Sequence, residues 1–298
     1  MKIWEKGYSI DRLVEDFTVG NDRMWDLRLA KYDVIASLAH AQMLCHIQLL
    51  TQQELEQLQS VFQEILRSIE SGNFTIEDTF EDVHSKLEFL LTEKLGETGK
   101  KIHTGRSRND QVLVAIQLYL KDEMRAIREQ IRELFDVLLA LSEKYREKLL
   151  PGYTHLQVAM PSSYGLWLGA YAESLVDDVL LWNAAYQIAN QNPLGSAAGY
   201  GTSIPLNRQM TTDLLGFATL KYNVVAAQMN RGKVERVVAF AIANLAATLS
   251  KLAMDICLYM SQNFGFVSFP DHLTTGSSIM PHKKNPDVFE LIRAKCNR

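Results

Sequence analysis

The sequence predicts an all-α protein: a central bundle of long helices with a smaller N-terminal helical domain. Apolar residues recur every three or four positions over three long stretches, which is the spacing of an amphipathic helix. Neither proline nor glycine interrupts the chain between Gly105 and Pro151. No long segment alternates apolar and polar residues with period two, so we expect little or no β-sheet.

The N-terminal part carries two shorter helical patterns, at residues 33–50 and 52–71. The second begins with Thr51-Gln52-Gln53-Glu54, a capping box in which two side chains satisfy backbone N–H groups at the helix start. A glycine and several charged or polar residues at 105–110 precede the first long helix. We therefore predict an N-terminal helical domain over residues 1–105.

Three apolar stripes define the long helices, from Leu113 to Leu141, from Tyr164 to Ala189 and from Val234 to Tyr259. As one helix, the first stretch approaches ~60 Å at 1.5 Å per residue. Helices of this length cannot bury an apolar stripe alone. They must pack as a bundle at shallow angles, within the chain or between chains. We assign residues 106–298 to this bundle domain.

The last segment opens a further amphipathic helix at Asp287, and the chain stops soon after Arg293. Little sequence remains to cover the apolar residues of this helix. Either other subunits cover it or the sequence is a fragment, so we expect the bundle domain to be incomplete at its C-terminus.

Composition narrows the classes of function. The chain has 298 residues, of which 47% are hydrophobic and 22% charged, and its net charge is −4. These proportions are typical of a globular protein. With no dominant basic face, nucleic acid is not expected as a partner. A local cationic pocket for an acidic substrate remains compatible with the composition.

The N-terminus and the cysteines bear on localisation. The N-terminal segment lacks the apolar core of a signal peptide, and no apolar run reaches the ~18–20 residues that span a bilayer. Cys45, Cys257 and Cys296 are scattered, with no metal-ligand spacing. We expect a cytoplasmic protein with no membrane partner and no metal.

The segment 275–286 is the most informative stretch for function. Two serines beside a glycine, two lysines and an asparagine fall within nine residues, between Ser277 and Asn285. Glycine and proline keep this segment out of regular structure. It can present backbone N–H groups, a hydroxyl and a cation to one anionic ligand, which suits a reaction that develops negative charge. The plainer alternative is a tight turn capped by hydroxyls.

Two further polar segments interrupt the helical pattern. In HTGRSRNDQ (103–111), Arg106 and Arg108 precede a helix whose free N–H groups attract anions. The alternative is a helix cap with solvated charges. In GYTHLQ (152–157), His155 is suited to proton transfer near neutral pH, although a lone histidine is more often a hydrogen-bonded structural residue.

Two acidic or histidine-containing positions and one glycine-rich loop complete the candidates. Glu290 follows the 275–286 segment by one helical turn and is placed to orient a histidine. His84 follows two acids, but four-coordinate metal spacing is missing, so we interpret it as substrate-facing or structural. The 192–201 loop lacks the lysine and the preceding strand of a phosphate loop, and we expect its small residues to serve close packing.

Taken together and in this order, HTGRSRNDQ, GYTHLQ and GSSIMPHKKNPD resemble the argininosuccinate lyases of the fumarase/aspartase superfamily, which have the lens δ-crystallins as relatives. The third segment resembles the superfamily signature, and the RSRND of the first distinguishes this family from its cousins. The resemblance extends over essentially the whole chain.

The resemblance implies a nearly all-α homotetramer whose sites are each built from segments of three subunits. It implies cleavage of argininosuccinate to arginine and fumarate, the last step of arginine biosynthesis, without cofactor. By the same resemblance, Ser277 is the base, Lys283 stabilises its charge, and His155 is the acid with Glu290 as its partner. The matching substrate-binding positions are Arg106, Ser107, Arg108, Asn109, Thr154, Asn285 and, more loosely, His84.

Family chains are about half as long again as this one, so the resemblance implies that the C-terminal third, including a small C-terminal domain, is absent. Two alternatives remain. One is another fumarate-releasing lyase, such as adenylosuccinate lyase, which RSRND argues against. The other is a non-catalytic, crystallin-like relative, which the complete set of Ser277, His155, Lys283 and Glu290 argues against.

Overall fold

A computed structural model describes residue 17 and residues 19–298, and it divides into two compact units. The first unit consists of Met1–Glu123 with Gln187–Glu235, and the second of Met124–Tyr186 with Arg236–Arg298. The long helices each begin in one unit and continue into the other. The compact units therefore cut across the predicted division at 105/106.

The first unit contains most of the shorter helices. Its elements are α2 (Asp22–His46), α3 (Gln52–Glu70), α4 (Val83–Leu95), α5 (Glu97–Lys100), the 3₁₀ turn η1 (Lys101–His103), the start of α6 (Arg108–Lys144), β3 (Gln191–Asn192), α8 (Arg208–Leu214), β4 (Thr219–Leu220) and α9 (Val224–Met229). The predicted capping box of α3 is confirmed: Glu54 N–H donates to Thr51 Oγ1 at 3.2 Å, and Thr51 N–H donates to Glu54 Oε2 at 2.9 Å.

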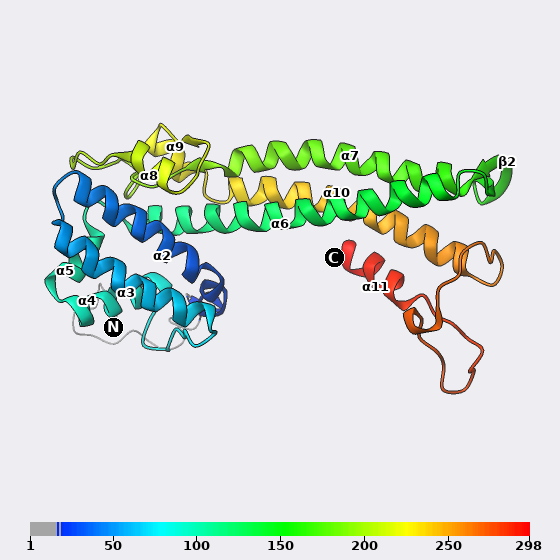
Figure 1. Ribbon diagram of the computed structural model, residues 1–298, viewed down its shortest axis with the longest axis horizontal. Helices are drawn as coiled ribbons and strands as arrows, with labels where there is room; N and C mark the ends of the chain where they lie inside the picture. Colours follow the sequence, from blue (N-terminus) through cyan, green and yellow to red (C-terminus); the bar gives the residue numbers. More distant parts are fainter. Residues whose placement is uncertain (1–16, 18) are drawn as a thin grey trace. The chain divides into compact units, whose positions relative to one another are not determined.

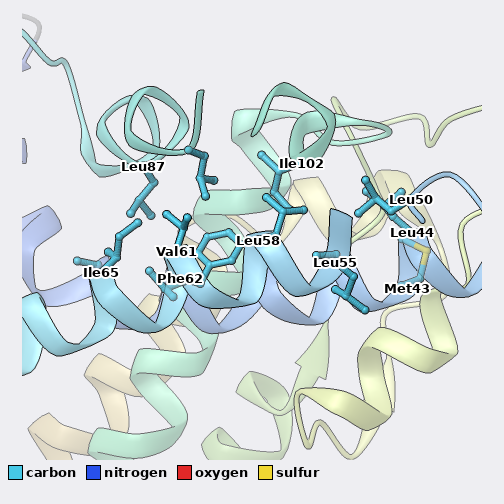
Figure 2. Close-up of a cluster of buried hydrophobic side chains, with 14 of the residues drawn as sticks. Met43, Leu44, Leu50, Leu55, Leu58, Val61, Phe62, Ile65, Leu87 and Ile102 are labelled. Carbon is cyan, nitrogen blue, oxygen red and sulfur yellow. The ribbon is translucent and has the colours of Figure 1, made fainter. Parts of the chain in front are cut away.

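An apolar core joins α2, α3 and α4 (Figure 2). Leu44, Leu58, Phe62, Val83 and Leu91 are almost completely inaccessible to solvent within it. Each such side chain contributes roughly 1.5–3 kcal/mol through burial. Because one face of α2 is buried in this core, the orientation of the helix is set. Its polar side chains then point toward the start of α6.

A second core holds the 192–217 region in place. Leu194, Leu215 and Phe217 pack against Ala36 of α2 and Val114 of α6. The loop that follows β3 is thereby kept beside the first turns of α6.

In the second unit, α6, α7 and α10 run alongside one another (Figure 1). The elements that contribute to this unit are α6, β1 (Leu149–Thr154), β2 (Gln157–Ser163), α7 (Tyr164–Ala189), α10 (Lys233–Met260), the 3₁₀ turn η2 (Asp271–Leu273) and α11 (Asp287–Cys296). Trp182 Nε1–H donates to Met124 O at 3.1 Å, and Asn244 Nδ2 donates to Asp178 Oδ1 at 2.5 Å. The three long predicted helices and the all-α class are thus confirmed.

Among the described residues the strands form two short pairs, which fits the expected scarcity of sheet. β1 and β2 make an antiparallel hairpin, and β3 and β4 pair in parallel over two residues. The hairpin contains the GYTHLQ segment, which the helical pattern alone did not identify as strand. Pro151 and Gly152 disfavour helix there, and the two strands pair antiparallel from Leu149↔Ser163 to Thr154↔Gln157.

The helices α6 and α7 approach closely beside this hairpin. A Cβ atom on Gly165 would lie 2.6 Å from Arg146 Cα and 2.7 Å from Ser142 O. Ser142 Oγ–H also donates to Gly165 O at 2.6 Å. Only glycine fits at this contact.

By length and composition alone, α10 qualifies as a membrane span, which the search for an uninterrupted apolar run did not anticipate. One such helix is weak evidence for a membrane protein, because the core helix of a bundle meets the same criterion. In this chain 22% of the apolar window of α10 is buried.

Candidate functional site

The predicted site residues are distributed over both compact units. Those in the first unit are His84, Arg106, Ser107, Arg108 and Asn109. Those in the second unit are Thr154, His155, Ser277, Lys283, Asn285 and Glu290. Each group is described within its own unit.

The RSRND segment forms the start of α6. Ser107 precedes the helix directly, and its N–H donates to Asp110 Oδ1 at 2.8 Å. Asn109 N–H donates to Ser107 Oγ at 3.3 Å. The segment thus closes on itself and exposes the Asn109 side chain.

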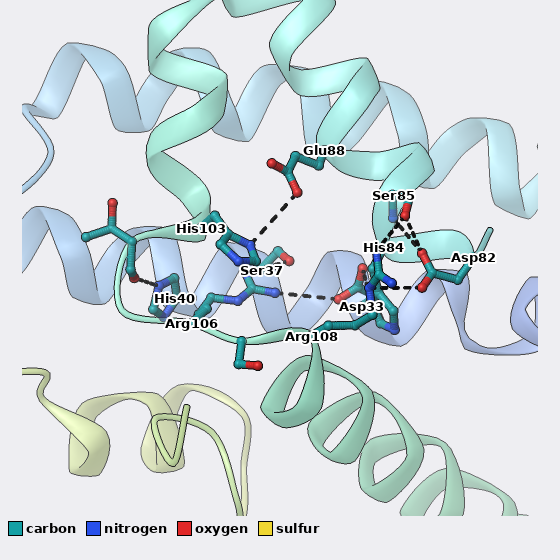
Figure 3. Close-up of polar contacts among 12 residues, drawn as sticks. Asp33, Ser37, His40, Asp82, His84, Ser85, Glu88, His103, Arg106 and Arg108 are labelled. Atoms are coloured by element: carbon teal, nitrogen blue, oxygen red, sulfur yellow. Dashed lines mark hydrogen bonds and ion pairs between the residues drawn. The ribbon is translucent and has the colours of Figure 1, made fainter. Parts of the chain in front are cut away.

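Arg106 turns inward from this segment (Figure 3). Its side chain is 1% exposed; Nη1–H donates to Ser37 Oγ at 3.0 Å, and Nη2 lies 3.7 Å from Asp33 Oδ1. Burial lowers the pKa of Arg106, although Asp33 and Asp110 act in the opposite direction. Among the described residues, Nε and Nη2 make no hydrogen bond. Arg106 therefore retains donors after its internal contacts are made.

His84 is paired with Asp33 in the same buried cluster (Figure 3). Its Nδ1 lies 3.0 Å from Asp33 Oδ2, and both side chains are shielded from solvent. Burial lowers the pKa of His84, but the carboxylates of Asp33, Asp82 and Asp26 together outweigh burial and the pKa is raised. Burial raises the pKa of Asp33, but His84 and Arg106 together lower it below its usual value. The pair is accordingly an internal salt bridge, and the choice between a substrate-facing and a structural role for His84 stays a prediction.

Arg108 binds the N-terminal end of α4. Its Nε lies 3.1 Å from Asp82 Oδ2, and its Nη1–H donates to Glu81 Oε2 at 3.2 Å. Nη2–H donates to Ser85 Oγ at 3.0 Å. The guanidinium is only partly exposed, so a substrate carboxylate bound here would share it with these acids.

His155 occupies the tip of the β1–β2 hairpin. His155 and Leu156 have φ angles of 52° and 58°, and both are exposed. Positive φ at two successive central residues is the geometry of a type I′ turn, which normally takes asparagine and glycine. Non-glycine residues held there cost roughly 1–3 kcal/mol each, and such strain clusters at functional sites.

The hairpin is attached to the helices by aromatic rings. The Tyr153 ring lies 5.5 Å from the Phe264 ring, edge to face, and 6.3 Å from the Phe266 ring. Tyr164 Oη–H donates to Phe266 O at 2.7 Å. These contacts connect the turn to the segment that follows α10.

Hydrogen bonds join the two ends of the 275–285 segment and close it into a loop. Thr275 N–H donates to Asn285 O at 3.3 Å, and Asn285 N–H donates to Thr275 O at 2.8 Å. Thr275 Oγ1–H also donates to Asp287, which opens α11. The loop between these bonds carries Ser277, whose Oγ accepts from Ile279 N–H at 3.4 Å.

Lys283 and Glu290 lie at the edges of this loop. Lys283 is exposed, and its N–H donates to Met280 O at 3.0 Å. Glu290 is exposed in the first turn of α11. In the described part of the chain, no hydrogen bond or ion pair joins His155 to Ser277, Lys283 or Glu290. The structure of one chain thus keeps the predicted acid and base as separate groups.

Sequence reasoning did not identify Asp33, Ser37 or Asp110 as supports of the candidate site. A signal for Asp110 was present, because Ser107-x-x-Asp110 has the spacing of a helix capping motif. Asp33 lies within the regular pattern of α2, and nothing local distinguishes it from a solvated acid.

Comparisons with known proteins cover the whole chain. A family model described as Lyase matches residues 6–298. The argininosuccinate lyase of Parabacteroides distasonis is 63% identical over 297 residues, which are 100% of this chain and 67% of that protein. Those of Bacteroides thetaiotaomicron and Thermotoga neapolitana are 62% and 44% identical, over 100% and 98% of this chain and 67% and 74% of those proteins.

Solved structures show the same fold. A crystal structure of EDDS lyase in complex with formate has a TM-score of 0.82 at 27% identity, over 98% of this chain and 57% of that one. A fumarate lyase:delta crystallin from Brucella melitensis, bound to cobalt, has a TM-score of 0.80 at 19% identity, over 97% of this chain and 69% of that one. This chain spans about two thirds of the length of the curated relatives. It belongs to the lyase family, on its argininosuccinate lyase branch.

Proposed function

We propose that this chain carries out the elimination reaction of argininosuccinate lyases, releasing fumarate and arginine. The observation that carries the proposal is the 275–285 loop, which is closed by the bridge between Thr275 and Asn285. It presents the Ser277 hydroxyl and the Lys283 ammonium on one short segment. Relatives of that name at 60–63% identity support the choice of substrate. A solved EDDS lyase variant with bound fumarate, 26% identical, supports the product class.

The reaction begins at the carbon next to a carboxylate. Ser277 Oγ, acting as an alkoxide, takes the proton from this carbon, and the electron pair moves into the adjacent carboxylate. The resulting dianion is strongly disfavoured in water, so cations and N–H donors must meet it. Lys283 and the backbone N–H groups of the loop supply that stabilisation.

The second half of the reaction breaks the carbon–nitrogen bond. The electron pair returns to form the double bond of fumarate, and the bonding pair of the C–N bond leaves with the guanidino nitrogen. His155 donates the proton that this nitrogen requires, and Glu290 orients and charges the imidazole. No cofactor enters this scheme.

The remaining predicted residues hold the substrate. Arg106 and Arg108 bind its carboxylates, and this role is supported by Nε and Nη2 of Arg106, which make no hydrogen bond among the described residues. His84 supports the same wall through Asp33. Polar side chains complete the grip: Ser107, Asn109, Thr154 and Asn285.

We also propose a cytoplasmic homotetramer with sites shared between subunits. Large apolar side chains are exposed on the bundle helices of the second unit, including Leu166 at 69%, Leu180 at 65% and Phe240 at 63%. A groove of about 390 Å³ lies between α6 and α7, lined by Ile131, Phe135, Leu175 and Val179. Exposed apolar surfaces of this kind mark subunit interfaces. The three free cysteines suit a reducing compartment.

The test is fumarate release, followed by the growth of its ultraviolet absorbance. The natural protein should turn over argininosuccinate and leave adenylosuccinate unchanged. Ser277→Ala should lower the rate by at least ~10³-fold, since it removes the base. Ser268→Ala, outside the loop, is the matched control and should keep the parent rate.

Three results would contradict the proposal. Faster release from adenylosuccinate would indicate the sibling enzyme. No release from either substrate by a folded parent would indicate a crystallin-like relative. A Ser277→Ala rate close to that of the parent would remove Ser277 from its role.

A further inference from the structure

Asp110 is a buried carboxylate to which neither the family resemblance nor the scheme above gives a part. Its relative exposure is 0%. Oδ1 accepts the N–H of Ser107 at 2.8 Å. Oδ2 accepts the N–H groups of Gly195 and Ala197, each at 3.0 Å. One side chain therefore ties the start of α6 to a loop more than eighty residues away in sequence.

The loop that Asp110 binds has a demanding backbone. Gly195 and Ala197 have φ angles of 84° and 51°, and the N–H groups of these two residues, on either side of Ser196, both donate to Asp110 Oδ2. A Cβ atom on Gly195 would lie 2.7 Å from Arg208 Cγ, so this position has no room for a side chain. The strained conformation of Ala197 requires partners that hold it in place.

Two other side chains grip the same loop from outside. Arg208 Nε–H donates to Leu194 O at 2.9 Å. Gln228 Nε2 donates to Ser196 Oγ at 2.9 Å and to Ala197 O at 3.0 Å. The loop is thus a fixed body, and Asp110 connects it to the RSRND segment.

The residues beside Asp110 are those assigned to substrate binding. Ser107 donates its N–H to Asp110 and accepts the N–H of Asn109 at 3.3 Å. Arg231, two residues after the end of α9, which carries Gln228, donates to Asn109 Oδ1 at 3.5 Å. Movement of the 195–197 loop would therefore shift Ser107 and Asn109 together.

We propose that Asp110 is a positioning residue, which fixes Ser107 and Asn109 for substrate by anchoring them to the 195–197 loop. The proposal rests on the proposed function, since it takes Ser107 and Asn109 as substrate contacts. Hydrogen bonds to a charged, buried acceptor are the strong ones, and an acceptor of this kind holds a backbone more firmly than a neutral one.

The test is Asp110→Asn in the natural protein. Asparagine keeps the size of the side chain but replaces one acceptor oxygen with an NH₂ donor. Both oxygens of Asp110 accept from backbone N–H groups, so this NH₂ group faces an N–H group in either orientation of the amide. KM for argininosuccinate should rise ~10-fold or more, while kcat changes less than about 3-fold, because the reacting groups lie on other segments. Amide hydrogen exchange at Gly195 and Ala197 should accelerate.

Asp178→Asn is the matched control, since Asp178 is also buried and accepts a side-chain hydrogen bond, from Asn244, but lies in the second unit. It should leave both KM and the exchange of the 195–197 amides unchanged. A parallel loss of kcat and stability in Asp110→Asn with no change in KM would show a purely structural role and would overturn the proposal.

Two further measurements keep the outcomes distinct. An inactive parent would refute the proposed function, whereas an active parent with unchanged KM in a folded Asp110→Asn would refute only the positioning role. Should Asp110→Asn not fold, Ser277→Ala can be saturated with argininosuccinate instead. Bound substrate should slow exchange at Gly195 and Ala197 by ~10-fold or more, and unchanged exchange would overturn the proposal.

Discussion

The Asp33 carboxylate is the centre of the buried polar cluster in the first unit. It lies 3.0 Å from His84 and 3.7 Å from Arg106, and Ser37, one turn along α2, accepts from Arg106. Buried ion pairs add little net stability, but removing one partner strands the other charge. The cluster therefore fixes the orientation of Arg106 more than it strengthens the fold.

The cluster predicts a specific pH dependence of stability. The pKa of His84 is raised in the folded chain above its usual 6.5, because Asp33 favours the imidazolium, with smaller help from Asp82 and Asp26. Its contribution is fully present below pH 6.5 and is lost as pH rises through the folded pKa. His40, whose pKa burial and Arg106 lower, acts only below pH 6.5, so the two effects separate.

Urea unfolding measured between pH 6 and 9 tests this dependence. The free-energy difference between the parent and His84→Gln should shrink with rising pH, by at most about 1.4 kcal/mol per pH unit. A control, His272→Gln at an exposed position, should retain the slope of the parent. A difference that stays constant over this range would mean that His84 is neutral in the folded chain.

At the residue scale, the sequence could name the motif residues but not their partners. RSRND and GSSIMPHKKNPD are local and legible. Asp33 contacts His84 and Arg106 across more than fifty residues of chain, and only the packing of α2 against α4 brings them together. Whether each named residue acts on substrate stays a prediction.

The hairpin between α6 and α7 is the element on which the proposed acid depends. His155 sits at a turn with two positive φ angles, and the Tyr153 ring anchors the first strand against Phe264. A strained turn keeps its geometry only when its surroundings hold it. The aromatic contacts are therefore the means by which His155 is aimed.

This dependence predicts different effects for two substitutions of one residue. Tyr153→Ala removes the ring and should lower kcat by ~10–100-fold, since a small misplacement of a reacting group is costly. Tyr153→Phe keeps the ring and should stay within about 3-fold of the parent. Fumarate release gives both rates.

Tyr200→Ala, at a ring that is 88% exposed, is the control and should leave kcat unchanged. If Tyr153→Phe lost as much activity as Tyr153→Ala, the hydroxyl rather than the ring contact would be responsible, and the anchoring role would be refuted.

Among the elements, the helices were predictable and the hairpin was not. The apolar stripes from Tyr164 and Val234 begin within one residue of the observed α7 and α10. A type I′ turn is normally signalled by asparagine and glycine, which His155 and Leu156 are not. Tertiary contacts impose that turn, so no local pattern could reveal it.

For the whole molecule, the separation of the proposed base and acid has a testable outcome. No hydrogen bond or ion pair joins His155 to Ser277 in the described part of one chain, and both are exposed or half-exposed. With sites shared between subunits, a mixed oligomer of His155→Asn and Ser277→Ala contains some sites with both residues intact. Mixing the two inactive variants after dissociation should therefore restore part of the activity.

Each variant carried through the same dissociation and reassembly alone is the control and should remain inactive. Native mass spectrometry should show mixed tetramers. Mixed tetramers without recovered activity would mean that His155 and Ser277 serve the same subunit's site.

The close contact at Gly165 helps to set the position of the hairpin tip, although glycine itself carries no functional group. The helices α6 and α7 touch near one end, and the hairpin extends beyond this contact. A change in the spacing of the helices at the contact would therefore displace the hairpin. A methyl group at Gly165 would push the two helices apart, since Arg146 Cα and Ser142 O leave it no space. The helices α6 and α7 would separate at this point, and the hairpin tip would move together with the imidazole of His155.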